Sequence, residues 1–198
     1  MAPSEGRTYR QEDWYGRDLG AERFDGDRFV DCDLTEITTS GTIFDRCEFS
    51  GVRLNASVHD GSRFSNCVFR ECSLFDATFR GCSMTGSRFV SSDLRPLHLE
   101  GGKWDFVSFF GADLRGVSFQ GMRLDESDFT NARLDSASFR DASLTGAVFL
   151  GATLPGAVFT GADASGAQLA GLSWRGVRID AQLAVLIAHS LGAVIDET

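Results

Sequence analysis

The stretch SDFTNARLDSASFRDASLTGAVFLGATL, residues 127–154, places a bulky apolar side chain at every fifth position. These positions are Phe129, Leu134, Phe139, Leu144, Phe149 and Leu154. An α-helix would repeat its buried face about every 3.6 residues and a β-strand about every 2 residues, so neither element explains the spacing. The period of five therefore indicates a repetitive coil in which each five-residue unit forms one side.

The same spacing runs along almost the whole sequence. Between Trp14 and Ile179, 34 positions lie five residues apart, and all are bulky and apolar except Thr39, His59 and Ala164. Fourteen of the 17 phenylalanines occupy these positions. Because the spacing never shifts by a residue, we expect no loop between units.

A second period of twenty residues is superimposed on the first. One column is Phe throughout, at Phe29, Phe49, Phe69, Phe89, Phe109, Phe129 and Phe149. The next column is Leu at Leu34, Leu54, Leu74, Leu94, Leu114, Leu134 and Leu154. Four units therefore close one turn, and like side chains stack at the roughly 4.8 Å spacing of paired strands. The expected fold class is all-β, a four-sided parallel β-solenoid of eight to nine coils, roughly 40 Å long.

The positions between the bulky ones are small. Ala is common two residues before each bulky residue, and Gly is common two residues after it, where the chain must turn a corner. The five cysteines all occupy the small inward position, so we expect buried, reduced thiols. They are Cys32, Cys47, Cys67, Cys72 and Cys82.

The A-[D/S/R]-[L/F]-x-G pattern over residues 12–181 resembles the pentapeptide-repeat family. This resemblance implies a right-handed quadrilateral parallel β-helix with 20 residues per coil. Three stretches are similar to the Qnr-like, topoisomerase-protecting group of the family: CSMTGSRFVSSDLRPLHL (82–99), FGADLRGVSFQGMRL (110–124) and RIDAQLAVLIAHSLG (178–192). Some members of that group carry projecting loops, and the unbroken spacing argues against such loops here.

The resemblance also implies a function. It predicts a non-enzymatic DNA mimic that binds DNA gyrase or another type II topoisomerase, as an inhibitor, a protector or a self-immunity factor. The outcome would be resistance to fluoroquinolones or to a natural topoisomerase poison. The alternative is a scaffold or adaptor that binds a non-topoisomerase protein, because a fold does not by itself define a function.

The sequence of the C-terminal segment predicts an α-helix instead of a further coil. We expect a flexible tail over residues 1–11, the solenoid over 12–179, and a helix with a short tail over 180–198. Asp180 is the expected N-cap, and Gly192 the expected end of the helix. The helix is apolar nearly all round and follows an apolar surface, which indicates a homodimer joined through the C-terminal ends. The expected dimer interface is Val148, Leu150, Val158, Leu183, Leu186, Ile187 and Leu191. The alternative is that the helix only covers the end of the coil.

The charge is acidic, with a net value of −9 and a pI near 4.8. It argues against direct binding of nucleic acid or an anionic membrane. Duplex DNA carries about one charge per 1.7 Å of axis, so any mimicry is partial. The expected partner-binding acidic surface is Asp93, Asp105, Asp113, Asp125, Glu126, Asp128 and Asp141. Phe75, Phe106 and Phe110 fall on outward positions and are possible aromatic contacts.

No catalytic residues are predicted. A coil filled with Phe and Leu has no pocket for a nucleophile and a base, so we expect no enzyme, no cofactor and no metal ion. His59 is expected to be a polar core residue, and His98 with Glu100 a solvated pair. The longest apolar run, residues 183–188, is too short to span a membrane, and no signal segment precedes it, so we expect a cytoplasmic protein. Pro96 marks a local irregularity over residues 93–99, because proline lacks the N–H of a ladder bond.

Overall fold

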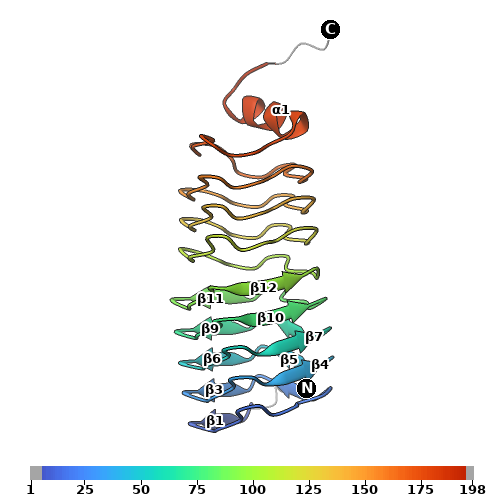
Figure 1. Ribbon diagram of the computed structural model, residues 1–198, viewed down its shortest axis with the longest axis vertical. Helices are drawn as coiled ribbons and strands as arrows, with labels where there is room; N and C mark the ends of the chain where they lie inside the picture. The colour runs from blue at the N-terminus through green and yellow to red at the C-terminus, as the bar shows by residue number, and fades with distance from the viewer. Residues whose placement is uncertain (1–5, 195–198) are drawn as a thin grey trace.

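The computed structural model describes residues 6–194. The chain forms an elongated stack of coils that ends in one helix (Figure 1). Every pairing between strands is parallel and joins residues twenty apart, so that Phe29 lies opposite Phe49 and Phe49 opposite Phe69. The expected fold class is confirmed, a parallel β-solenoid with a C-terminal helix.

Each coil has four faces, which we number 1 to 4 in the order in which the chain passes through them, starting at residues 23–25. Face 1 carries β2 (Arg23–Asp25), β5 (Ile43–Asp45) and β8 (Arg63–Ser65). Face 2 carries β1 (Thr8–Arg10), β3 (Arg28–Val30), β6 (Glu48–Ser50), β9 (Val68–Arg70) and β11 (Arg88–Val90). Face 4 carries β4 (Thr38–Ser40), β7 (Val58–Asp60), β10 (Ala77–Arg80) and β12 (Leu97–Glu100). On face 3 the coils are joined by single bridges, the first of which pairs Asp13 with Asp33. The coils after residue 100 are also joined by single bridges, the last of which pairs Val158 with Arg178.

The first coil begins earlier than the expected boundary at residue 12. β1 lies within the segment that we expected to be a tail, and it pairs with β3. Its central residue, Tyr9, continues the Phe column of face 2, because its ring stacks on that of Phe29 with a centroid separation of 4.9 Å. Residues 1–5 of the expected tail, and residues 195–198 at the other end, lie outside the described residues.

Each corner is a residue with a left-handed backbone. From Gln11 to Gly176 every fifth residue has a positive φ, except at Ala21 and Pro96. Glycine adopts this conformation freely, whereas other L-residues lose about 1–2 kcal/mol, with Asn and Asp the most tolerant. The backbone thus explains both the recurrent Gly and part of the acidic excess at corners, for example at Asp31.

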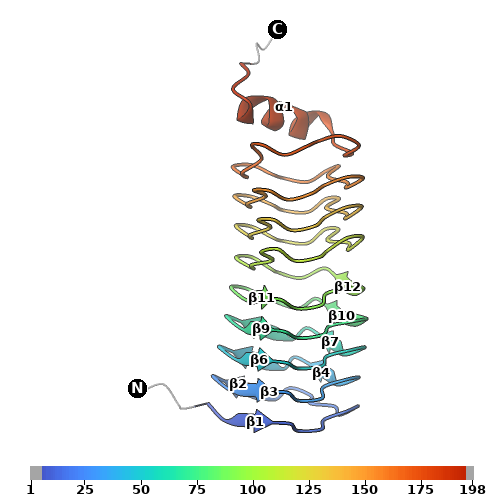
Figure 2. The same cartoon turned by 90° about the vertical axis from the view of Figure 1, so that its left-hand side faces the viewer.

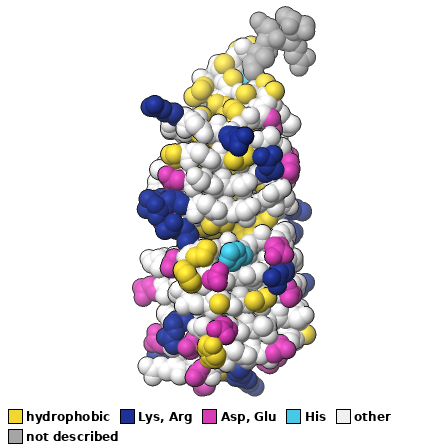
Figure 3. All heavy atoms as spheres, in the orientation of Figure 1, with side chains coloured by type: hydrophobic (Ala, Val, Ile, Leu, Met, Phe, Trp, Pro, Cys, Tyr) yellow, Lys and Arg dark blue, Asp and Glu magenta, His cyan; other side chains and the backbone are white. Residues whose placement is uncertain are grey.

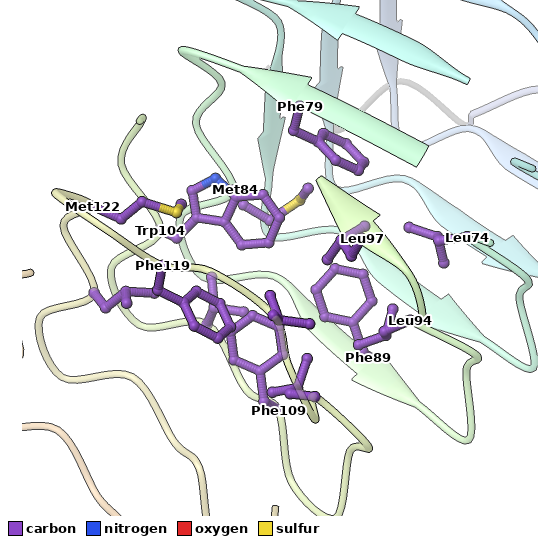
Figure 4. Close-up of a cluster of buried hydrophobic side chains, with 14 of the residues drawn as sticks. Leu74, Phe79, Met84, Phe89, Leu94, Leu97, Trp104, Phe109, Phe119 and Met122 are labelled. Atoms are coloured by element: carbon purple, nitrogen blue, oxygen red, sulfur yellow. The ribbon is translucent and has the colours of Figure 1, made fainter. Parts of the chain in front are cut away.

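The interior is filled by stacked rings. Along face 2 the Phe rings from Phe29 to Phe149 stack with centroid separations of 4.7–5.4 Å. A second column of rings starts on face 1, with Phe24, Phe44 and Phe64, and continues on face 4, with Phe119, Phe139 and Phe159. The exchange takes place around Trp104, which contacts Phe79 at 5.6 Å and Phe109 at 6.1 Å between ring centroids (Figure 4).

The backbone ladder is interrupted where this exchange occurs. Among the described residues, no backbone hydrogen bond joins residues 91–101 to residues 110–120. Face 1 and face 2 remain continuous there, through the bridges from Ser83 to Lys103 and from Arg88 to Ser108. The interruption therefore affects face 3 and face 4 and spans half a turn. It includes Pro96, so the predicted irregularity is confirmed and is larger than expected.

The helix α1 (Ala181–Ser190) lies across the last coil (Figure 2). Asp180 is its N-cap, as predicted, because its carboxylate accepts the N–H of Leu183 at 2.9 Å and that of Gly161 at 2.7 Å. Leu183 and Ile187 are buried on the end of the core. Of the elements in residues 6–194, no helix has the length and apolar content needed to cross a membrane.

Candidate protein-binding surface

The seven acidic residues predicted as a partner surface do not form one patch. The twenty-residue turn places Asp93 and Asp113 on face 3, Asp128 on face 2, and Asp105 and Asp125 on face 1. Glu126 and Asp141 lie at the two corners that border face 1, both with left-handed backbones. A partner that contacted all seven would have to surround the rod.

Asp105 was expected on the surface, and this prediction is wrong. Its side chain is only 2% exposed. The carboxylate accepts the N–H of Asp125 in the next coil at 3.2 Å and lies 3.0 Å from Arg123 Nε and 3.5 Å from Lys103 Nζ. It therefore caps a backbone donor between two cations and is not available to a partner.

Asp113 and Asp125 are also neutralised by cations. The Asp113 carboxylate lies 2.7 Å from Arg115, 2.9 Å from Arg95 and 3.7 Å from Arg133. The hydrogen bond from Arg115 lowers the pKa of Asp113, and Arg95 adds to the effect. Asp125 lies 2.9 Å from Arg123. Neither carboxylate offers an uncompensated negative charge.

The remaining four acids are better placed. Within residues 6–194 no cation lies at ion-pair distance from Asp93, Glu126, Asp128 or Asp141. Glu126, Asp141 and Asp93 are exposed, whereas Asp128 is half-buried because it accepts hydrogen bonds from Thr130 N and Ser108 Oγ. Glu126 and Asp128 therefore lie near the border of face 1 with face 2, Asp141 lies at the border of face 1 with face 4, and Asp93 lies on face 3.

The three off-column phenylalanines are exposed. Phe75, Phe106 and Phe110 have 51%, 53% and 59% of their surface accessible. Phe106 occupies a left-handed corner, a costly place for an aromatic residue. Tyr15, which the sequence pattern did not single out, is also exposed.

The predicted dimer interface is only partly a free surface. Leu183 and Ile187 are buried against their own coil, so they cannot contact a second copy, and that part of the prediction is corrected. Leu186, Val148 and Val158 are half-buried, whereas Leu150 and Leu191 are exposed, Leu191 by 72%. Val185 and Val194 are exposed too, and the sequence pattern missed them because the helix is apolar on every side. Figure 3 shows apolar side chains gathered at the C-terminal end of the rod.

His59 and the cysteines are titratable groups of the interior. His59 is fully buried, and its ring nitrogens are hydrogen-bonded to Thr39 Oγ1 at 2.8 Å and Ser57 Oγ at 3.0 Å. Burial lowers the pKa of His59 to about 3, and it raises the pKa of Cys72 to about 12. The five cysteines are free and buried. His98 is bonded to Asp76 at 2.7 Å, and nowhere in residues 6–194 do three or more His, Cys, Asp or Glu side chains gather as metal ligands.

This geometry defines a parallel β-solenoid whose repeating unit is five residues. A family model described as pentapeptide repeat region matches residues 58–129, and a second, described as pentapeptide repeats (8 copies), matches residues 137–171. Together the two models cover more than half of the 198 residues. The chain belongs to the pentapeptide-repeat family.

The comparison with solved structures found two proteins that illustrate the similarity. A trypsin-treated variant of QnrB1, a plasmid-mediated fluoroquinolone resistance protein, is 20% identical, with 95% of this chain and 99% of that chain covered and a TM-score of 0.48. HetL from the cyanobacterium Nostoc sp. strain PCC 7120, involved in heterocyst differentiation regulation, is 20% identical over 86% of each chain, with a TM-score of 0.31. The comparison with curated proteins gave no match.

Proposed function

We propose that this protein is a non-enzymatic rod that binds a type II topoisomerase, with DNA gyrase as the expected enzyme, at a surface that otherwise holds duplex DNA. It would act in the cytoplasm and protect the enzyme from a quinolone or a natural poison. The observation that carries the proposal is an elongated stack with a net charge of −9, without projecting loops among the described residues. The resemblance of residues 82–99, 110–124 and 178–192 to the Qnr-like group of the pentapeptide-repeat family, to which the chain belongs, is its second ground.

Three of the expected acidic residues support a contact in the second half of the rod. Glu126, Asp128 and Asp141 keep their charge without an internal cation, and they lie within one coil of one another along the chain. Asp105 and Asp113 are removed from the expected contact because their charges are compensated within the chain. An enzyme surface that binds phosphates would attract the first three residues and not the last two.

A supercoiling assay with purified gyrase, with and without a quinolone, tests the proposal. The protein should alter supercoiling or reduce drug-induced cleavage, and added salt should weaken the effect because exposed charges are screened. The variant with Glu126→Lys, Asp128→Lys and Asp141→Lys should lose at least about tenfold in potency. Glu71→Lys is a matched control, since Glu71 is also an exposed glutamate with a left-handed backbone. Absence of any association with gyrase at low salt would exclude the proposal.

The second candidate is a scaffold or adaptor for a non-topoisomerase protein. The exposed Phe75, Phe106 and Phe110 favour it, because exposed aromatic residues are enriched at protein interfaces. In that case Phe110→Ser would abolish partner capture, whereas the charge-reversal variant would retain it. The two candidates therefore predict opposite responses to the two sets of substitutions.

We also propose that the rod forms a two-fold homodimer through its C-terminal ends. The exposed Leu191, Val194 and Val185 on and after α1, together with Leu150, form the apolar surface that supports it. A dimer would double the length of the acidic rod. Sedimentation at micromolar concentration measures it directly.

A further inference from the structure

The interruption of the ladder leaves two strand edges without partners. In the turn that precedes the interruption, Leu74 N donates to Asp93 O at 2.8 Å and Gly81 N donates to Glu100 O at 2.9 Å. The equivalent N–H groups one turn later, of Leu94 and Gly101, have no backbone acceptor among the described residues. Buried or semi-buried backbone groups are normally paired, so these edges have unused hydrogen-bonding capacity.

The opposite edge shows the same deficit. Ser138 N donates to Val117 O at 3.0 Å, but Ser118 N has no such bond to Leu97 O, nor does Leu99 N bond to Ser118 O. β12 therefore presents the Leu97 carbonyl and the N–H groups of Leu99 and Gly101. The facing edge presents the N–H and C=O of Ser118. The two edges together have the alternating donors and acceptors that an extended peptide pairs with on both sides.

A cavity separates the two edges. It has a volume of about 310 Å³ and is lined by residues 96–100 and residues 115–118. Leu99 is half-exposed there, whereas Phe79 and Phe119, which precede and follow it in the same column, are buried. Leu99 therefore contributes an aliphatic surface to the cavity.

The charges at the rim are already paired within the chain. Arg95 and Arg115 contact Asp113, His98 contacts Asp76 at 2.7 Å, and Arg80 contacts Glu100 at 3.2 Å. The rim therefore favours a neutral segment.

We propose that this opening is a docking slot for an extended, uncharged segment of a partner protein, with aliphatic side chains at alternate positions. The segment would enter as an additional strand, pair with Leu99 and Gly101 on one side and Ser118 on the other, and place one aliphatic side chain on Leu99. This mode of binding is strand addition, in which backbone hydrogen bonds supply affinity and alternate side chains supply selectivity. The inference goes beyond the proposed topoisomerase binding and does not rest on it.

The probe is a capped heptapeptide of alternating threonine and valine, TVTVTVT, used with the whole protein. Amide exchange followed by NMR should show that the peptide slows the exchange of Leu99, Gly101 and Ser118 by roughly tenfold. The same peptide with N-methyl groups on alternate residues keeps its aliphatic side chains and its carbonyl oxygens. It loses the N–H donors of one edge, where the methyl groups also obstruct strand pairing, so it should give much weaker protection. Leu99→Lys should abolish protection, whereas Ser138→Lys, which adds the same charge to an intact part of face 4, should not.

Three results would overturn the proposal. The first is that the unmodified peptide protects none of these amides at millimolar concentration. The second is equal protection by both peptides. The third is protection that rises with protein concentration when no peptide is present. The third would identify a second copy of this chain as the occupant. Because the N-methyl comparison is made on the unsubstituted protein, the test holds even if Leu99→Lys does not fold.

Discussion

The guanidinium of Arg95 lies 2.9 Å from the carboxylate of Asp113, in the next coil, and joins the two coils where their backbones do not pair. The pair is about one third exposed, so we expect it to contribute no more than about 1 kcal/mol to global stability. Its local effect should be larger, because few other contacts hold face 3 closed at this point.

Arg95→Ala should therefore accelerate local opening more than global unfolding. We expect faster amide exchange at Leu114, whose N–H donates to Arg133 O at 2.9 Å, with a small change in Tm. Arg133→Ala is the matched control, since Arg133 lies 3.7 Å from the same carboxylate but belongs to a part of face 3 whose ladder is intact. Equal exchange in the two variants would show that the Arg95 contact does not hold the coils together.

His59 should make the protein acid-sensitive in a defined range of pH. Its pKa is about 3 in the folded chain and about 6.5 when unfolded, so the unfolded state binds the extra proton between these values. Above about pH 6.5, protonation of His59 does not affect stability. Below that value the free energy of unfolding falls by about 1.4 kcal/mol for each pH unit, until the pH reaches about 3.

Denaturant unfolding at several pH values measures that slope. His59→Gln should remove it while keeping a polar partner for Thr39 and Ser57. Gln120→Ser, which changes no titratable group at an exposed position, should leave the slope unchanged. A slope that is the same in all three proteins would refute the prediction.

Gly102 is expected to tolerate no side chain. It has a φ of +108°, and a Cβ atom there would lie 2.3 Å from the carbonyl oxygen of Cys82, which is backbone and cannot rotate away. Gly102→Ala should therefore lower the free energy of unfolding by at least about 2 kcal/mol more than Gly101→Ala. Gly101 also has a positive φ but meets no atom within 4 Å, so it isolates the cost of the backbone conformation. Thermal unfolding of the two variants makes the comparison, and similar values would contradict it.

Leu191→Asp should convert the proposed dimer into a monomer without unfolding the coil. The side chain is largely exposed, so in a monomer the substitution leaves the core intact, whereas in an apolar interface it would bury a charge. Gln120→Asp changes the net charge equally at an exposed position far from the C-terminus. Sedimentation velocity at micromolar concentration should show the shift for Leu191→Asp alone. A monomer in the unsubstituted protein would rule out the interface.

The architecture could be predicted from the sequence because inward position, corner and face are all functions of residue number. The columns of Phe and Leu and the buried cysteines follow from a period of five or twenty, and the N-cap at Asp180 follows from its place before an apolar helix. Asp105 could not be placed in this way, since its burial depends on the N–H of Asp125 and on the cations of Arg123 and Lys103 that hold the carboxylate. The pattern marks which side of the chain a residue occupies, and it does not report which neighbour neutralises it.

The C-terminal surface shows the same limit. α1 is apolar on every side, so its sequence has no period that separates the side on the coil from the side in solvent. Only the placement of the helix distinguishes the buried Leu183 from the exposed Leu191. The interruption of the backbone ladder was also more extensive than Pro96 alone indicated. Within the same turn, around Trp104, the second column of rings passes from face 1 to face 4.

The left-handed corner at every fifth residue restricts how this chain can change its length. Inserting or deleting one residue would put a polar side chain into the interior and a bulky one at a bend in every later coil, so such events should be lost by selection. Duplication or removal of a twenty-residue block keeps every residue on its side. The reach of the rod along a partner can thus evolve only in steps of one coil, roughly 4.8 Å each.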